Sequence, residues 1–292
     1  MDLQRPYPWV IRVAWVALPF ALSAAVGAAL HPQVEAVRLV AAVLLWAAWA
    51  VVLVGTLVPW PVALTALRLC APGAFAVALA AAVSGRPSPL AAIAAVVVSG
   101  VDLVLAFLPT TGMLYVNGPA YPNERRFPLR PPGALLLGPI ELSWAVVVGA
   151  PSIGALLLAG GHWVAGGLVA VIGLPAAFVL ARSLHALSRR WVVFVPAGVV
   201  LHDPLSLLDP VLFTRQTIET LRPAPADSDS LDLTHGALGL ALELILREKV
   251  PMTRAKPGQV FGESGASARL LFTPTRPGQV LAEAGRRRVP VG

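Results

Sequence analysis

Long uninterrupted apolar runs dominate the first two-thirds of the chain and predict membrane-spanning helices. A helix needs roughly 20 apolar residues to cross about 30 Å of hydrocarbon, and the intervals between charged residues supply stretches of that length. Four such stretches precede residue 109, at 13–30, 39–58, 62–83 and 89–108. The uncharged stretch 142–181 is long enough for two more, joined at Gly160-Gly161-His162. The pattern therefore predicts a bundle of six transmembrane helices.

The pattern changes after residue 185 to short apolar runs broken by turn residues. Residues 191–195 and 199–201 are rich in β-branched side chains and flank a tight turn, which predicts a hairpin. The stretch 191–208 is apolar enough to suggest a seventh span, but Pro196, Gly198 and Pro204 interrupt it. Further strands are expected at 211–217, 238–246 and 268–273, although periodicity alone allows a helix over 238–246.

The chain is expected to close with a helix. Thr275 is placed as its N-cap and Pro277 in its first turn, where proline is favoured. Val280, Leu281 and Ala284 form an apolar stripe along it. Arginines 286–288 follow at the negative end of the helix dipole.

Composition supports the membrane class. Apolar residues make up 57% of the chain and charged residues 13%, and the mean hydropathy is +0.76. Soluble domains average about 25% charged residues, so disordered, collagen-like and disulfide-framed classes are excluded. The single cysteine rules out an intrachain disulfide.

The distribution of charge predicts two domains and an orientation. Residues 1–185 are expected to form the transmembrane domain, with a loop at 109–141, and residues 186–292 a water-soluble domain. Nine arginines fall on the side of the six spans that holds both termini and two on the other. Because basic residues concentrate in cytoplasmic loops, we expect both termini in the cytoplasm. The net charge of +7 divides between the domains, which argues against a nucleic-acid partner.

Three stretches carry a resemblance to a known group of proteins. They are residues 123–132 (NERRFPLRPP), 194–204 (FVPAGVVLHDP) and 274–283 (PTRPGQVLAE). They resemble a group of uncharacterised multi-spanning membrane proteins of high-GC, actinobacterial-type bacteria with a C-terminal pleckstrin-homology-like (PH-like) domain. The resemblance implies a small β-rich α+β domain of PH-like fold that ends in a helix. It also implies that the spans lie in the inner membrane of a bacterial cell, and it implies no activity.

Asp102 is the one acidic residue well inside a predicted span. A carboxylate at bilayer depth costs on the order of 2.5–3.5 kcal/mol, so the side chain is expected to face the bundle interior. Two interpretations remain open. Asp102 is a proton or cation site, or it is a structural group that caps a neighbouring backbone or pairs with Arg68.

The loop 109–141 is rich in proline and carries Arg125, Arg126 and Arg130. Such arginines attract anionic lipid headgroups or hold a phosphate through bidentate hydrogen bonds. The alternatives are that the loop docks on the other domain or only enforces topology. Glu141 and Glu124 flank the arginines.

Other motifs carry no chemistry. Residues 227–232 lack the spacing of a calcium loop, so a solvated turn is expected there. Ser264 lacks the strand-to-helix context of a nucleophile elbow, so a flexible loop is expected there. No catalytic, cofactor-binding or metal-ligating residue is assigned.

Three functions are therefore considered. The first is a non-enzymatic anchor or scaffold that presents a PH-like domain to a membrane or cytoplasmic protein or to anionic lipid headgroups. The second is a transporter or channel-like protein that uses Asp102. The third is a membrane enzyme acting on a lipid phosphate, with the arginine loop and acidic partners.

Overall fold

The computed structural model describes residues 6–256 and 261–292, and it divides the chain into two compact units. The first unit holds the chain up to Tyr115 together with Glu141–Leu184. The second unit holds Val116–Ile140 and His185–Gly292. The segment 116–140, expected to be a loop of the transmembrane domain, thus groups with the C-terminal region. The second unit is discontinuous in sequence.

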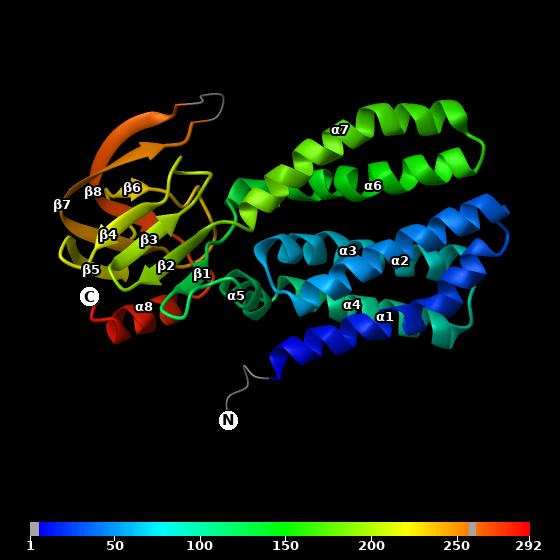
Figure 1. Ribbon diagram of the computed structural model, residues 1–292, viewed down its shortest axis with the longest axis horizontal. Coiled ribbons are helices and arrows are strands. Elements are labelled where there is room, and N and C mark those ends of the chain that lie inside the picture. Colours follow the sequence, from blue (N-terminus) through cyan, green and yellow to red (C-terminus); the bar gives the residue numbers. More distant parts are fainter. Residues whose placement is uncertain (1–5, 257–260) are drawn as a thin grey trace. The chain divides into compact units, whose positions relative to one another are not determined.

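Six helices of the described chain are long and apolar enough to cross a membrane (Figure 1). They are α1 (Tyr7–Leu30), α2 (Glu35–Leu57), α3 (Pro61–Ser84), α4 (Pro89–Phe107), α6 (Pro139–Ala159) and α7 (Trp163–Leu187). This confirms the six predicted spans and indicates a multi-pass membrane protein. A short helix, α5 (Pro109–Asn117), follows α4.

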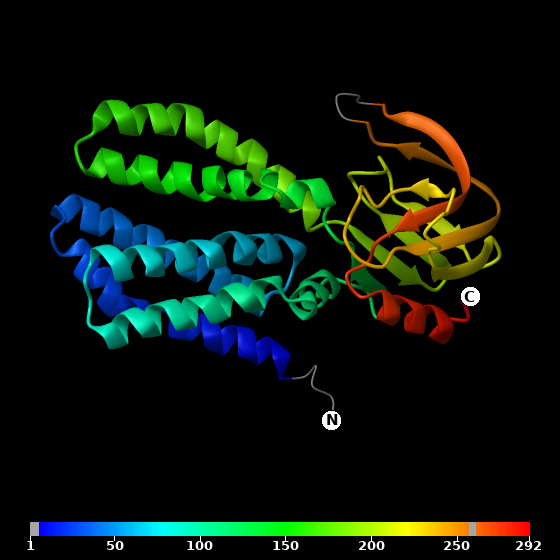
Figure 2. The same ribbon diagram turned by 180° about the vertical axis from the view of Figure 1, so that it is seen from behind.

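Small side chains form much of the core of the first unit. α4 packs against α3 and α1 (Figure 2), and Ala71, Ala78 and Ala95 at their contacts are fully buried. Short side chains let helix backbones approach closely in lipid. Between α1 and α2, Trp15 Nε1 donates to the Trp49 carbonyl and Trp49 Nε1 donates to the Trp15 carbonyl, both at 2.9 Å. The indole polar groups are therefore satisfied within the bundle.

Glycines let α6 and α7 pack closely against each other. A Cβ on Gly173 would lie 2.6 Å from Cβ of Ala150, and one on Gly154 would lie 3.3 Å from Val169. The first distance leaves no room for a side chain at Gly173, and the second is a tight contact.

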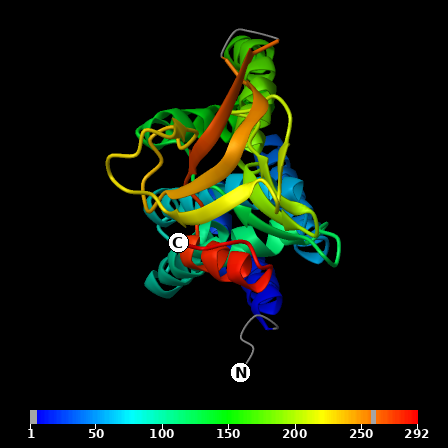
Figure 3. The ribbon, with the colours of Figure 1, turned by 90° about the vertical axis from the view of Figure 1, so that its left-hand side faces the viewer.

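The second unit contains two four-stranded sheets and a closing helix (Figure 3). The first sheet has the antiparallel order β1-β2-β3-β4, and the second has the order β5-β7-β8-β6, with β6 parallel to β8. The strands are β1 (Arg125–Pro128), β2 (Trp191–Val195), β3 (Gly198–His202), β4 (Val211–Thr214), β5 (Ile218–Pro223), β6 (Leu231–Asp232), β7 (Leu242–Arg254) and β8 (Glu263–Phe272). A 3-10 turn, η1 (Gly133–Leu136), follows β1.

The strand predictions hold at most positions. β2 and β3 form the expected hairpin, with Trp191 opposite His202, so the stretch 191–208 is not a seventh span. Of the ambiguous run 238–246, residues 242–246 lie in strand β7, and residues 238–241 precede it without forming a helix or a strand. Ser264 was expected in a flexible loop, which is wrong, because it pairs with Thr253 within the β7–β8 ladder. Residues 256–260 and 276–280 share the letters PGQV, which predicts a turn at each; residues 257–260 of the first lie outside the described residues.

The closing helix α8 (Pro277–Arg286) begins one residue later than the predicted cap implies. Pro277 opens the helix as expected, and Val280 and Ala284 are fully buried. Thr275 is not the N-cap, which is Arg276. The Thr275 backbone N–H donates instead to the Pro128 carbonyl at 2.9 Å, which fixes Thr275 beside β1.

Candidate functional site

Asp102 lies on the buried face of α4 and is 3% exposed. Ala95, Ser99 and Ala106 share this face. Ser99 is satisfied, because its hydroxyl donates to the Ala95 carbonyl at 2.6 Å. The Oδ2 atom of Asp102 is buried and has no hydrogen-bond partner in the described part of the chain. The sequence prediction of an inward-facing carboxylate is confirmed.

Arg68 does not neutralise Asp102 within the described residues. Its Nε donates to the Ala106 carbonyl at 3.4 Å, and its guanidinium carbon lies 5.8 Å from the centroid of the Phe107 ring. The salt bridges of the described chain do not include an Arg68–Asp102 pair. The predicted alternative of a pair with Arg68 is therefore wrong.

Other polar groups of the first unit have partners. The Tyr7 hydroxyl lies 2.6 Å from the Thr111 hydroxyl. Arg12 donates to the Thr56 carbonyl from Nε at 3.2 Å and from Nη2 at 3.1 Å. Unpaired buried polar groups are rare because each loses its water without compensation. Asp102 is the exception among these groups.

The arginine segment supplies a strand. Arg126 pairs in register with Val193 in the β1–β2 ladder. Its backbone N–H donates to Asn117 Oδ1 at 2.9 Å, and Asn117 Nδ2 donates to its carbonyl at 2.8 Å. The Arg126 side chain pairs with Glu124 at 2.9 Å and lies 5.5 Å from the ring centroid of Trp191.

The three predicted arginines are separated by this strand geometry. Arg125 and Arg126 are consecutive in β1, so they point to opposite faces of the sheet. Arg130 follows the strand, and a Cβ on Gly239 would lie 3.0 Å from its Nε. Asp102 and Glu141 belong to the first unit, whereas the three arginines belong to the second. The arginines do not form one phosphate clamp.

A buried polar network near β2 was missed by the sequence analysis. Arg190, which is 2% exposed, donates to both carboxylate oxygens of Asp203 at 2.6 and 2.7 Å. Ser206 donates to Asp203 at 2.7 Å, and its hydroxyl lies 2.8 Å from His235 Nε2. Burial opposes ionisation of Asp203, but the bonds from Arg190 and Ser206 outweigh it and hold its pKa below the usual range. Both carboxylate oxygens of Asp203 accept hydrogen bonds, so the network holds the backbone in place and does not orient a nucleophile.

Glu243 in β7 is a second satisfied carboxylate, 1% exposed. It accepts hydrogen bonds from Arg222 at 2.8 Å, Ser228 at 2.7 Å and Ser230 at 2.6 Å. Burial alone would raise its pKa, yet these bonds lower the pKa to about 2. Two serines of the segment 227–232 thus hydrogen-bond to Glu243. No group of three potential metal ligands occurs in the described residues.

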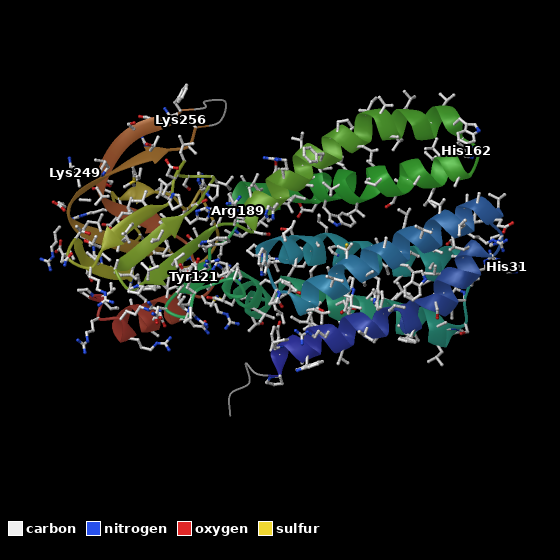
Figure 4. The ribbon with its side chains drawn as sticks, viewed as in Figure 1. His31, Tyr121, His162, Arg189, Lys249 and Lys256 are labelled. Atoms are coloured by element: carbon white, nitrogen blue, oxygen red, sulfur yellow. The ribbon has the colours of Figure 1, made fainter. Side chains whose placement is uncertain are left out.

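Two histidines lie in connections between helices of the first unit. Figure 4 labels His31 and His162, which lie in the connections that follow α1 and α6. It also labels Arg189, the exposed neighbour of buried Arg190. Sequence analysis interprets both arginines as topology signals, and no local pattern separates the buried arginine from the exposed one. The nearest signal for the network is Asp203 in the stretch 194–204.

Comparison with protein-family models, with curated proteins and with solved structures finds no match to this chain.

Proposed function

We propose that this protein is an integral membrane scaffold that presents a PH-like domain for interaction with a protein or with lipid headgroups. The observation that carries this proposal is the discontinuous second unit. Its first strand precedes α6, and its second strand follows α7. The chain therefore links the sheet unit to membrane-spanning helices near residues 116, 140 and 185. Such multiple attachment suits a domain that works beside a bilayer.

The topology of the second unit supports the PH-like assignment. The strands form two sheets that are antiparallel except where β6 pairs with β8, and the bridge between Leu129 and Pro274 joins the end of β1 to the end of β8. The closing helix α8 packs against β5. In this assignment, the α6–α7 hairpin is an insertion between the first two strands of the domain.

The arginine asymmetry supports a cytoplasmic location for both termini and for the PH-like domain, with the spans in a bacterial cell membrane. In that orientation, the domain faces cytoplasmic proteins and the anionic headgroups of the inner leaflet.

Site-specific photocrosslinking in living cells tests the proposal. A photoreactive residue is placed at Leu212 in β4, at Leu238 or at Phe261, which are 44%, 67% and 88% exposed. Val171 in α7, 75% exposed, serves as the control position within a span. We expect a discrete protein or headgroup adduct from at least one position in the second unit, and only acyl-chain adducts from Val171. The absence of adducts from all three positions, while Val171 reacts, would contradict the proposal.

A second candidate function rests on the unpartnered Oδ2 of Asp102. Ionisable groups inside membrane bundles are costly and commonly belong to ion or proton pathways. A transporter or channel-like protein would use this carboxyl as its proton or cation site. No observation of comparable weight favours the enzyme hypothesis.

Flux measurements in proteoliposomes test this candidate. Asp102→Asn should abolish a proton- or cation-dependent flux, whereas Glu35→Gln, an exposed carboxylate at the start of α2, should leave it unchanged. Equal flux in wild type and Asp102→Asn would remove Asp102 from the function.

A further inference from the structure

The second unit has a shallow cavity, widely open to the surface, of about 450 Å³ and with a strongly basic lining. Four segments distant in sequence meet there: the turn before β1, the turn after β2, the turn after β4, and the end of α8. The lining residues are Pro122, Asn123, Pro196, Arg215, Arg286, Arg287 and Arg288. Four of the seven are arginines and none is acidic, so the cavity has the charge of an anion site. Tyr121, labelled in Figure 4, marks the turn that contributes Pro122.

Only part of this positive charge is neutralised. Glu283 on α8 pairs with Arg286 at 2.6 Å and with Arg287 at 2.7 Å. Arg215 and Arg288 form no ion pair in the described part of the chain. One carboxylate therefore faces four guanidinium groups, which leaves a net charge of +3.

Hydrogen bonds to backbone carbonyls link the segments that line the cavity. Arg287 Nη1 donates to the Asn123 carbonyl at 2.8 Å, which ties the turn before β1 to α8. The Arg215 N–H donates to the Ala197 carbonyl at 3.1 Å, which joins the β4–β5 turn to the β2–β3 turn. The arginines therefore sit on elements already fixed by the fold.

Arg288 occupies a position that favours glycine. Its φ is +57°, and the Val289 N–H donates to the Ala284 carbonyl at 2.9 Å while the Arg288 N–H donates to the Gly285 carbonyl at 3.1 Å. These bonds form a Schellman motif, in which glycine usually takes the left-handed residue. An arginine there carries a conformational cost that helix capping does not require, and residues that break a local rule commonly serve function.

We propose that this arginine cavity binds the phosphate group of an anionic lipid headgroup. The inference rests on the proposed function and names the ligand of the PH-like domain. Guanidinium groups match phosphate oxygens with paired, charge-assisted hydrogen bonds. The headgroup is the expected source of the phosphate, because the attachments near residues 116, 140 and 185 keep the domain beside the bilayer.

Hydrogen exchange on the full chain in lipid nanodiscs tests the proposal. Wild type is compared in nanodiscs of phosphatidylcholine and in nanodiscs that also contain phosphatidylglycerol. A third sample holds inorganic phosphate over phosphatidylcholine nanodiscs. We expect phosphatidylglycerol to slow exchange about fivefold in peptides covering 212–217 and 284–290. Inorganic phosphate should have a smaller effect, because it lacks the bilayer that holds the headgroup beside the site.

Variants assign the effect to the cavity. Arg215→Gln and Arg288→Gly together should abolish the slowing by phosphatidylglycerol, and Arg288→Lys alone should retain part of it. Arg276→Gln, at the opposite end of α8 and outside the cavity lining, should behave as wild type.

Three results would overturn the proposal. They are equal exchange of wild type in both nanodiscs, equal slowing in the Arg215/Arg288 double variant, and slowing by inorganic phosphate that matches phosphatidylglycerol. The last would assign the site to a free anion. These failures differ from a failure of the scaffold proposal, which would show as unprotected amides in β2 and β3 or as silent photocrosslinking positions.

Discussion

The two units differ in the hydrogen bonding of their buried carboxylates. In the second unit, Asp203 and Glu243 are each 1% exposed, and hydrogen bonds from arginine and serine side chains satisfy them. In the first unit, Asp102 is 3% exposed, and its Oδ2 has no partner in the described residues. The same chemical group is thus hydrogen-bonded in one unit and has an unpartnered oxygen in the other. The lack of a partner, and not burial alone, makes Asp102 the candidate for a functional carboxyl group.

The largest effect is expected from breaking the buried ion pair of the second unit. Asp203→Ala leaves Arg190 buried without its partner, which costs about 3–5 kcal/mol of unfolding free energy. Hydrogen exchange of amides in β2 and β3 measures this loss. Asp209→Ala, an exposed aspartate in the same loop, should change exchange little. Equal protection in both variants would show that the pair does not hold the unit together.

A smaller loss of stability is expected at acidic pH. The pKa of Glu243 is about 2 in the folded chain against an ordinary value of 4.5. A depressed pKa gives stabilisation that is complete above pH 4.5 and is lost as the pH falls towards 2. Thermal unfolding of the full chain, followed by the strand signal in circular dichroism, should show this decline.

Glu243→Gln provides the matched comparison. It should lower stability at neutral pH by about 1–3 kcal/mol, because charge-assisted bonds are lost, and it should flatten the decline below pH 4.5. Glu248→Gln, exposed on the same strand, should keep the wild-type pH profile. An unchanged profile in Glu243→Gln would contradict the assignment.

Asp102→Asn should have a smaller effect on stability than either change in the second unit. The carboxyl Oδ2 has no bond to lose, so the unfolding free energy of the first unit should stay within about 1 kcal/mol of wild type. Thermal unfolding in detergent measures this difference. A loss as large as that of Asp203→Ala would show that Asp102 is a structural group like the carboxylates of the second unit.

The smallest expected effect is a gain in the stability of the second unit. Arg288→Gly relieves a left-handed arginine with φ +57°, so it should raise the stability of the second unit by up to about 1 kcal/mol. Thermal unfolding checks the direction. A loss of stability would mean that the Arg288 side chain supports the fold.

The sequence predicts the spans well because the signal is local. A run of apolar residues between charges determines each helix without reference to the rest of the chain. The inward orientation of Asp102 follows from the same reasoning, since lipid excludes an unpaired carboxylate. The lack of a pair with Arg68 depends on side-chain geometry that spacing does not encode.

The strand β1 escapes sequence analysis because its partner is distant. Arg126 pairs with Val193, and the α6 and α7 spans lie between them in the chain. Its arginines and Pro128 also hide the strand pattern, because β propensity disfavours proline and charge. The Arg190–Asp203 pair was missed for a related reason, since an arginine after a span is read as a topology signal.

Disulfide trapping tests the pairing of β1 with β2 most directly. Arg126→Cys and Val193→Cys are introduced together in the full chain with Cys70→Ser, because these two residues face each other in the ladder. We expect rapid disulfide formation under mild oxidation, detected by mass spectrometry, and slow formation for the mismatched pair Arg126→Cys and Val195→Cys. Failure of the matched pair to cross-link, or equal rates for both pairs, would contradict the assembly of the second unit around the α6–α7 insertion.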